Sequence, residues 1–285
     1  MPLQNPVRSL LAIAILLASP VIRAQDSGGA PSMKDLMAKA QRAKMPPPSP
    51  LDKMLALDSM LREKRPNWKT QFEECQFDID PDAFADTVVD VPLVLGVRIA
   101  DGVLAIQAKD SEKLGQCADD IEVLARKLNV AEEKLNRAES ARKAATKGEW
   151  LKVFSELSRL QDDVLKEIER DSNRDRGPIL MSGGWLQGIR FAAKVVADEK
   201  NYSGPLSNFL REPRLVASLR ENLAKLPAEI RDRPNVKEMD RLMETIGKII
   251  NVGLDDSKPD GWIPRDQVLE LVKLTETFVG SLQKK

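Results

Sequence analysis

The feature that most constrains the fold is a helical spacing of apolar side chains over residues 111–147. Apolar or small residues recur there at alternating intervals of three and four positions, with charged residues between them. These positions are Leu114, Cys117, Ile121, Leu124, Leu128, Ala131, Leu135 and Ala138. Such a seven-residue repeat places one apolar stripe along a helix and is typical of a coiled-coil seam. We therefore predict one long helix here and, after a turn at Gly148, a returning helix from Trp150 that completes an antiparallel hairpin.

The rest of the chain after residue 50 has the same helical character. Aromatic residues make up only 4% of the chain and β-branched runs are rare, which disfavours a sandwich or barrel of strands. Further helices are predicted over 51–64, 91–109, 179–200, 205–226 with a break at Pro213, 235–253 and 264–282. The predicted fold class is all-α, a multi-helix antiparallel bundle over residues 51–285.

The N-terminal 24 residues are typical of a secretory signal peptide. Arg8 precedes an apolar run over residues 9–22, and the small residue Ala24 follows it. As a helix this run would reach about 21 Å, short of the roughly 30 Å hydrocarbon core of a bilayer. We expect cleavage after Ala24, with retention as an uncleaved anchor as the alternative. The protein is then exported, periplasmic or secreted, with no transmembrane segment in the mature chain. Residues 25–50, rich in Pro, Gly and Ser, are predicted to be a flexible linker.

Composition excludes several classes of function. The chain has no histidine, which removes Ser-His-Asp and Cys-His catalysis, the common zinc sites and the usual axial ligand of haem. Lys+Arg and Asp+Glu are equal at 44 each, and the charges are interspersed. Nucleic acids and anionic membranes reward clustered positive charge instead, so neither is expected as a partner. We expect a non-enzymatic protein without a cofactor, with an enzyme based on carboxylates, Lys or Ser as a lesser alternative.

Two apolar segments resemble each other. Residues 95–106 align with residues 187–198, and the identical pairs are Gly96/Gly188, Arg98/Arg190, Ala100/Ala192 and Val103/Val195. One interpretation is an internal duplication that gives two helical halves, 75–172 and 177–285, packed together. The alternative is chance similarity between amphipathic helices. The neighbouring sequence SGGW (182–185) is interpreted as a flexible loop or a helix break.

Arg98 and Asp101 interrupt the most apolar segment of the mature chain. On a helix over 91–109 they lie on one polar stripe, and Arg190 occupies the matching position in the second segment. A buried arginine needs a partner, because leaving a buried charge unpaired costs roughly 3–5 kcal/mol. Its planar fork suits a carboxylate on a neighbouring helix. We interpret these residues as structural ion pairs; the alternative is a pocket in which Arg98 and Arg190 bind an anionic ligand.

The two cysteines, Cys75 and Cys117, are predicted to form a disulfide, since an exported compartment is oxidising. The short chain after Cys75 cannot reach Cys117 if a straight helix begins at Asp82, so the bridge requires a helix start near Asp90–Pro92. Buried free thiols are the alternative.

Two acidic segments invite comparison with calcium loops. Asp78, Asp80 and Asp82 alternate, but they are interpreted as helix-capping residues. Residues 256–267 resemble an EF-hand loop, with Asp256 and Asp260 at its first and fifth positions, Gly261 at its sixth and Ile263 at its eighth. Lys258 and Gln267 replace two ligands, and Pro264 suits a simple helix start. No metal site is therefore predicted, although Asp256 and Asp260 are the candidates; the segment is interpreted as a helix–turn–helix connection with Trp262 packed against the bundle.

Together these features predict an exported, non-enzymatic helical bundle with a structural or protein-interaction role in the periplasm or cell envelope, acting on a protein partner that the sequence does not identify. The alternative is a ligand- or ion-binding helical bundle with an anionic-ligand pocket near Arg98 and Arg190.

Overall fold

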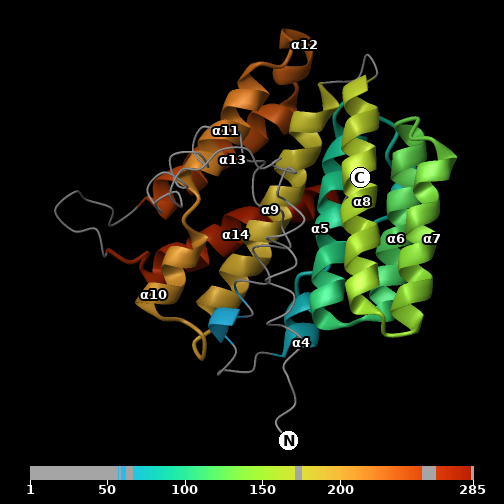
Figure 1. Cartoon of the computed structure of the whole chain (residues 1–285). Coiled ribbons are helices and arrows are strands. Elements are labelled where there is room, and N and C mark those ends of the chain that lie inside the picture. Colours follow the sequence, from blue (N-terminus) through green and yellow to red (C-terminus); the bar gives the residue numbers. More distant parts are fainter. Residues whose placement is uncertain (1–56, 58, 62–66, 171–174, 252–260, 284–285) are drawn as a thin grey trace, which may run out of the picture. The chain divides into compact units, whose positions relative to one another are not determined.

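The computed structural model describes residues 57, 59–61, 67–170, 175–251 and 261–283, and every regular element in these ranges is a helix (Figure 1). The elements are α4 (Trp68–Glu73), η1 (Pro81–Ala83), α5 (Asp90–Ala108), α6 (Ser111–Lys127), α7 (Glu132–Thr146), α8 (Trp150–Arg170), α9 (Arg176–Ala197), α10 (Gly204–Ser207), η2 (Asn208–Leu210), α11 (Pro213–Ala224), α12 (Ala228–Arg231), α13 (Pro234–Ile250) and α14 (Arg265–Leu282). The all-α prediction is confirmed. The predicted signal peptide and linker lie outside the described residues.

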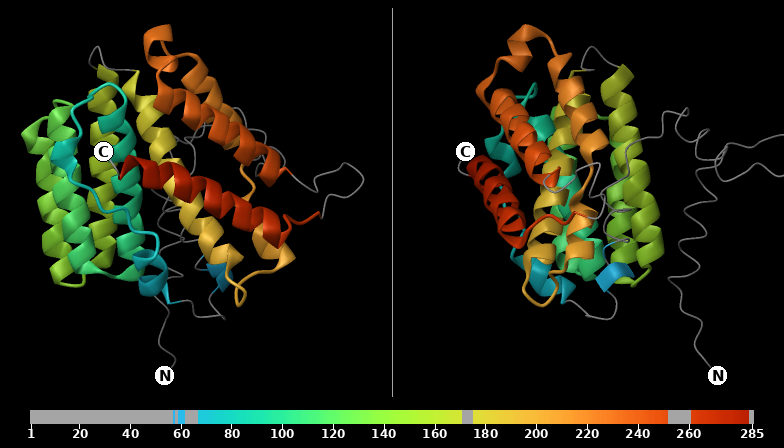
Figure 2. Two further views of the ribbon diagram at one scale, coloured as in Figure 1. Left: turned by 180° about the vertical axis from the view of Figure 1, so that it is seen from behind. Right: turned by 90° about the vertical axis from the view of Figure 1, so that its left-hand side faces the viewer.

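Helices α5 and α9 form the centre of the described unit. On one side α5 packs against α6 and α8, and α7 packs against both α6 and α8 (Figure 1). On the other side α9 packs against α11 and α14, and α13 contacts both of these helices. Figure 2 shows from behind that α14 crosses α9. The two central helices therefore join two groups of helices, and the side chains at the α5–α9 contact are buried.

The start of α5 agrees with the position that the sequence indicated. The helix begins at Asp90 with Pro92 in its first turn, where proline is tolerated because its missing N–H would have no intrahelical partner. Every residue from Val91 to Ala105 is buried. Among the described residues α5 is the one helix with the length and apolar composition of a membrane span, and its burial is typical of the core helix of a bundle.

The prediction of one continuous helix over 111–147 is wrong, because the chain turns back after Lys127. Asn129 takes a left-handed conformation with φ 61°, which asparagine adopts more readily than most residues. The amide of Asn129 donates to the carbonyl of Arg126 and that of Val130 to the carbonyl of Ala125, the two bonds of a Schellman ending. The apolar stripe is thus shared by two antiparallel helices, α6 and α7, and there is no continuous seam. The returning helix does begin at Trp150, as α8.

Helices α5 and α9 approach closely at three glycines. A Cβ on Gly96 would lie 2.0 Å from the carbonyl oxygen of Leu180, and one on Gly183 would lie 2.3 Å from that of Leu93. The backbone of Gly184 faces Gly96 from the opposite helix. The interpretation of SGGW as a loop or helix break is therefore wrong: its glycines lie inside α9, where the absence of side chains lets α5 pack against it.

The remaining described helices are close to their predicted ranges. The break at Pro213 is confirmed, since α11 begins there after the short α10 and η2. Pro264 immediately precedes α14. Within the predicted helix over 51–64, Leu57 and residues 59–61 are helical, and Leu57 and Leu61 are buried.

Candidate functional site

Arg98 and Asp101 form a buried ion pair, as predicted. Both lie on α5, with side chains only 1% and 0% exposed, and Nη1 of Arg98 is 2.8 Å from Oδ2 of Asp101. The other terminal nitrogen, Nη2, is 2.7 Å from Oδ2 of Asp120 on α6. Nη1 also donates to the carbonyl oxygen of Phe77 over 2.6 Å. The planar fork of Arg98 therefore ties α5 to α6 and to the segment before α5.

Arg190 belongs to the same network through Gln187, one turn earlier on α9. Nε2 of Gln187 donates to Oδ1 of Asp101 over 2.5 Å, and Nη1 of Arg190 donates to Oε1 of Gln187 over 3.2 Å. The structure thus joins the three residues of the predicted polar stripe, Arg98, Asp101 and Arg190, in one continuous set of hydrogen bonds. Sequence reasoning missed Asp120 and Gln187, although Gln187 precedes Arg190 by the same three positions that separate Arg98 from Asp101.

Side chains of this network also hold the segment that leads from the last turn of α4 toward η1. The carbonyl oxygen of Cys75 accepts from Gln187 over 3.1 Å and from Arg190 over 3.0 Å. The amide of Phe77 donates to Oδ2 of Asp101 over 3.3 Å. One turn further along α9, Nζ of Lys194 donates to the carbonyl oxygen of Glu74 over 3.1 Å. We call residues Glu74–Phe77 the strap.

The network is closely balanced in charge, with two arginines facing two aspartates. Burial raises the pKa of Asp101 to about 6, against the opposing effect of Arg98 and the hydrogen bond from Gln187. Burial also raises the pKa of Asp120. For Arg98, burial lowers the pKa, but Cys117, Asp101 and Asp120 outweigh it and the net shift is upward. Arg98 is therefore a fixed positive charge, and Asp101 is the member of the pair whose charge responds to pH near neutrality.

The predicted disulfide is absent, since Cys75 and Cys117 are both free and buried. Gln187 and Arg190 hold the backbone of Cys75, within the strap, against α9. Cys117 lies on α6 and faces α5, with its Cβ 3.9 Å from the position that a Cβ on Gly102 would take. Burial raises the pKa of the Cys75 thiol to about 11 and also raises that of Cys117. Both are therefore poor nucleophiles in the folded protein. The helix start at Asp90 arises without the bridge that motivated its prediction.

The acidic segment after the strap has a structural role. The carboxylate of Asp80 accepts from the amide of Asp82 over 3.0 Å and caps η1, as predicted. Nζ of Lys127 donates to the carbonyl oxygens of Pro81, Asp82 and Phe84 over 2.8, 3.2 and 2.9 Å. Within the described residues no group of three or more Cys, Asp or Glu side chains could hold a metal ion. The metal candidates Asp256 and Asp260 lie outside the described residues, while Trp262 is half exposed with its ring against Gly204.

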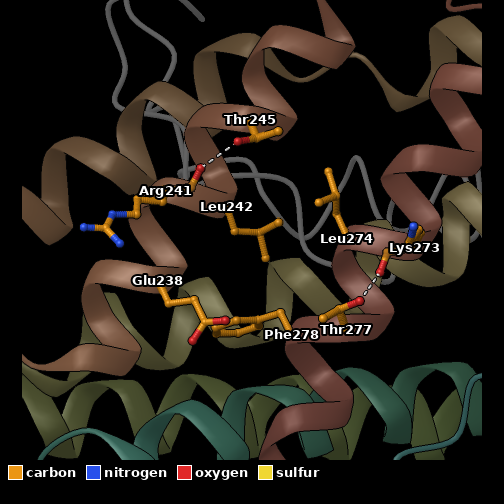
Figure 3. A pocket seen from close by; sticks show the side chains of 8 residues that line it. All are labelled: Glu238, Arg241, Leu242, Thr245, Lys273, Leu274, Thr277 and Phe278. Atoms are coloured by element: carbon orange, nitrogen blue, oxygen red, sulfur yellow. Dashed lines mark hydrogen bonds between the residues drawn. The ribbon is translucent and has the colours of Figure 1, made fainter.

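An open groove with a volume of about 280 Å³ lies between α13 and α14 (Figure 3). Its apolar surface comes from Leu242, Leu274 and Phe278, which project between the two helices in Figure 3. Arg241 and Lys273 stand at its edges, together with Glu238, Thr245 and Thr277. Sequence reasoning missed the groove, because the apolar positions of each helix look like ordinary core residues until the spacing of the two helices is known.

Comparison with known protein families, with curated proteins and with solved structures finds no match to this chain. The site is therefore interpreted from its own geometry. The buried network fixes helices and the strap relative to one another, while the α13–α14 groove is open to solvent.

Proposed function

We propose that the protein is an exported, non-enzymatic helical bundle that binds another protein, and that the α13–α14 groove is the surface of contact. The observation that carries this proposal is the contrast between the two polar regions. Arg98 is 1% exposed and already bonded to two carboxylates, whereas the groove is open, with the partly buried Leu274 beside the buried Leu242 and Phe278 and with charged residues at its edges. Apolar contacts surrounded by a polar rim are the usual anatomy of a protein–protein contact.

The groove favours an amphipathic helix or extended segment as its occupant. Leu274 and Phe278 are four residues apart on α14, so they present one apolar strip along the groove. Arg241 and Lys273 favour acidic residues beside the apolar anchors of the partner, as in helix-in-groove recognition. Eight residues line the groove, whereas a standard interface has about 20–30 residues on each side. The groove would therefore hold the anchor residues of a larger contact.

Two variants of the same helix test this role. Leu274→Asp puts a charge in the groove and should abolish binding of the partner protein. Leu269→Asp changes a residue that is 44% exposed and lies outside the groove, so it should leave binding of the partner protein intact. A photo-crosslinking amino acid at Thr277 should capture a protein in the exported fraction, and the same group at Thr146, exposed at the end of α7, should not. Equal capture from both positions, or equal binding by both variants, would contradict the proposal.

Export is tested separately by intact mass. Cleavage after Ala24 gives a mature chain that begins at Gln25, and this species should be found outside the cytoplasm. A full-length species confined to the cytoplasm would refute export without bearing on the groove.

An anion-binding role has one observation in its favour. Arg190 is half-buried, its Nε is buried without a hydrogen-bond partner, and it forms no ion pair with a carboxylate in the described part of the chain. Titration of the full chain with inorganic phosphate, compared with the Arg190→Gln variant, tests this candidate: saturable binding that the substitution removes would support it, and no binding would rule it out.

A further inference from the structure

We propose that the strap, residues Glu74–Phe77, opens and closes over α5 and α9 in a pH-dependent manner through Asp101, and that its opening exposes the thiol of Cys75. The proposal does not depend on the partner-binding function.

The geometry of the strap is the first support. Glu74 and Cys75 form the turn that ends α4, with their amides bonded to the carbonyls of Thr70 and Phe72, and Gln76 and Phe77 have no regular structure, yet Cys75 and Phe77 are fully buried. Side chains supply the contacts that hold its backbone to the core: Lys194, Gln187 and Arg190 from α9, and Arg98 and Asp101 from α5. A segment held to α5 and α9 by side chains can detach from them without breaking the backbone hydrogen bonds inside those two helices, so its opening is a local event.

Asp101 is the member of this set on which the others converge. Its carboxylate accepts from the amide of Phe77, from Arg98 and from Gln187, and Gln187 in turn bonds to Cys75 and Arg190. Asp120 holds the second terminal nitrogen of Arg98. A change in the charge of Asp101 therefore leaves Arg98 paired and is transmitted mainly to the strap and to α9.

Ionisable groups surround Asp101 on several elements. They are Arg98 on its own helix, Cys117 and Asp120 on α6, Cys75 on the strap, and Arg190 and Lys194 on α9, which act on Asp101 itself or on Arg98 and Cys75. Further out, Glu276 of α14 and Glu74 pair with Lys194, and Asp78 acts on Asp120. On the α8 side the neighbouring Gly102 faces the apolar side chain of Leu157. Asp101 is the fully buried carboxylate of this set, so removal from water affects it most.

The direction of the effect follows from that burial. In the closed strap burial outweighs the hydrogen bond from the Phe77 amide and the charge of Arg98, both of which lower the pKa of Asp101, and raises it from 3.8 to about 6. An opened strap returns the carboxyl toward water and its ordinary value. The closed form therefore binds a proton more tightly than the open form, and acid favours closure. With these two pKa values the opening equilibrium constant rises about tenfold between pH 5 and pH 8.

Hydrogen exchange of the full chain tests this inference at the amide of Phe77. After division by the intrinsic chemical rate, its opening constant should rise about tenfold from pH 5 to pH 8, with a midpoint near pH 6. The opening constant at Phe77 should also exceed that of the buried amide of Met243 in the middle of α13 at each pH, because exchange at Met243 requires that helix to unfold. Labelling of Cys75 by 4,4′-dithiodipyridine in a Cys117→Ala variant, normalised to a free thiol, should follow the same profile.

Two matched substitutions identify the group responsible. Asp101→Asn should remove the pH dependence, and Asp120→Asn, which keeps Asp101, should retain it. A wild-type opening constant that is flat, or that rises toward acid, would overturn the proposal, as would an unchanged profile in Asp101→Asn. The wild-type profile decides the sign by itself, so the inference stays open to refutation even if Asp101→Asn does not fold.

Discussion

The close approach of α5 and α9 makes Gly96→Ala the sharpest test of the fold. The added Cβ would lie 2.0 Å from the carbonyl oxygen of Leu180 and 2.9 Å from the amide nitrogen of Gly184. Both are backbone atoms, so a rotamer change cannot relieve the clash and the helices must move apart by more than 1 Å. A gap of this size forfeits about a quarter to a half of each dispersion contact along the interface.

The magnitude follows from two opposing effects. Overpacking of a tight core costs about 1–3 kcal/mol, and more where backbone must move. Alanine in place of glycine inside a helix returns about 1 kcal/mol through its higher helix propensity. Because the clash is with backbone atoms, we expect a cost at the upper end of this range and a net loss of about 2 kcal/mol in the free energy of unfolding.

Gly115 supplies the matched control on α6. It too lies inside a helix, but a Cβ there would meet nothing within 4 Å. Gly115→Ala should therefore stabilise the protein by about 0.5–1 kcal/mol. Denaturant unfolding followed by circular dichroism measures both variants. If Gly96→Ala proves as stable as the wild type, the helices do not approach as described and the packing argument fails.

Three further predictions concern the buried network. Arg98→Leu should cost about 3–5 kcal/mol at pH 7, because Asp101 and Asp120 lose their partner, and less at pH 5, where Asp101 takes up a proton; denaturant unfolding at both pH values checks this. Because the folded-state pKa of Asp101 is raised to about 6, its stabilising contribution is fully present below pH 3.8 and is lost as the pH rises through 6. We therefore expect the difference in unfolding free energy, wild type minus Asp101→Asn, to fall by about 2 kcal/mol from pH 4 to pH 7.5. A difference that stays constant would show that the pKa of Asp101 is not raised by folding. Without reductant, Cys75 and Cys117 should both be alkylated in denaturant, giving two adducts by intact mass; a two-hydrogen deficit and no adducts would show a disulfide instead.

The sequence was sufficient to predict the class of fold, because helical spacing of apolar residues is a local property. It was also sufficient to predict that Arg98 is paired, since a buried guanidinium has no other stable state. The prediction of one continuous helix failed at residues 128–131, because the three- and four-residue intervals between apolar residues continue unchanged across the turn there. Asn129 is the local signal of that turn, and the repeat concealed it because two antiparallel helices of suitable length can share one apparent heptad pattern.

The partners of Arg98 show why a site of this kind is only half readable from sequence. Asp101 is on the same helix, so a spacing of three residues identifies it. Asp120 and Gln187 come from helices whose orientation depends on the turns at Lys109 and Asn129 and on the glycines of α9. Each of those backbone features is compatible with several arrangements by itself, and only their combination brings a carboxylate of α6 and an amide of α9 to the same guanidinium–carboxylate pair. The glycines at 183 and 184 are the decisive ones, because without their close contact to α5 the side chain of Gln187 could not reach Asp101 over 2.5 Å. A substitution that separates α5 from α9 should therefore disturb the strap as well, which links the packing of Gly96 to the pH response of Asp101.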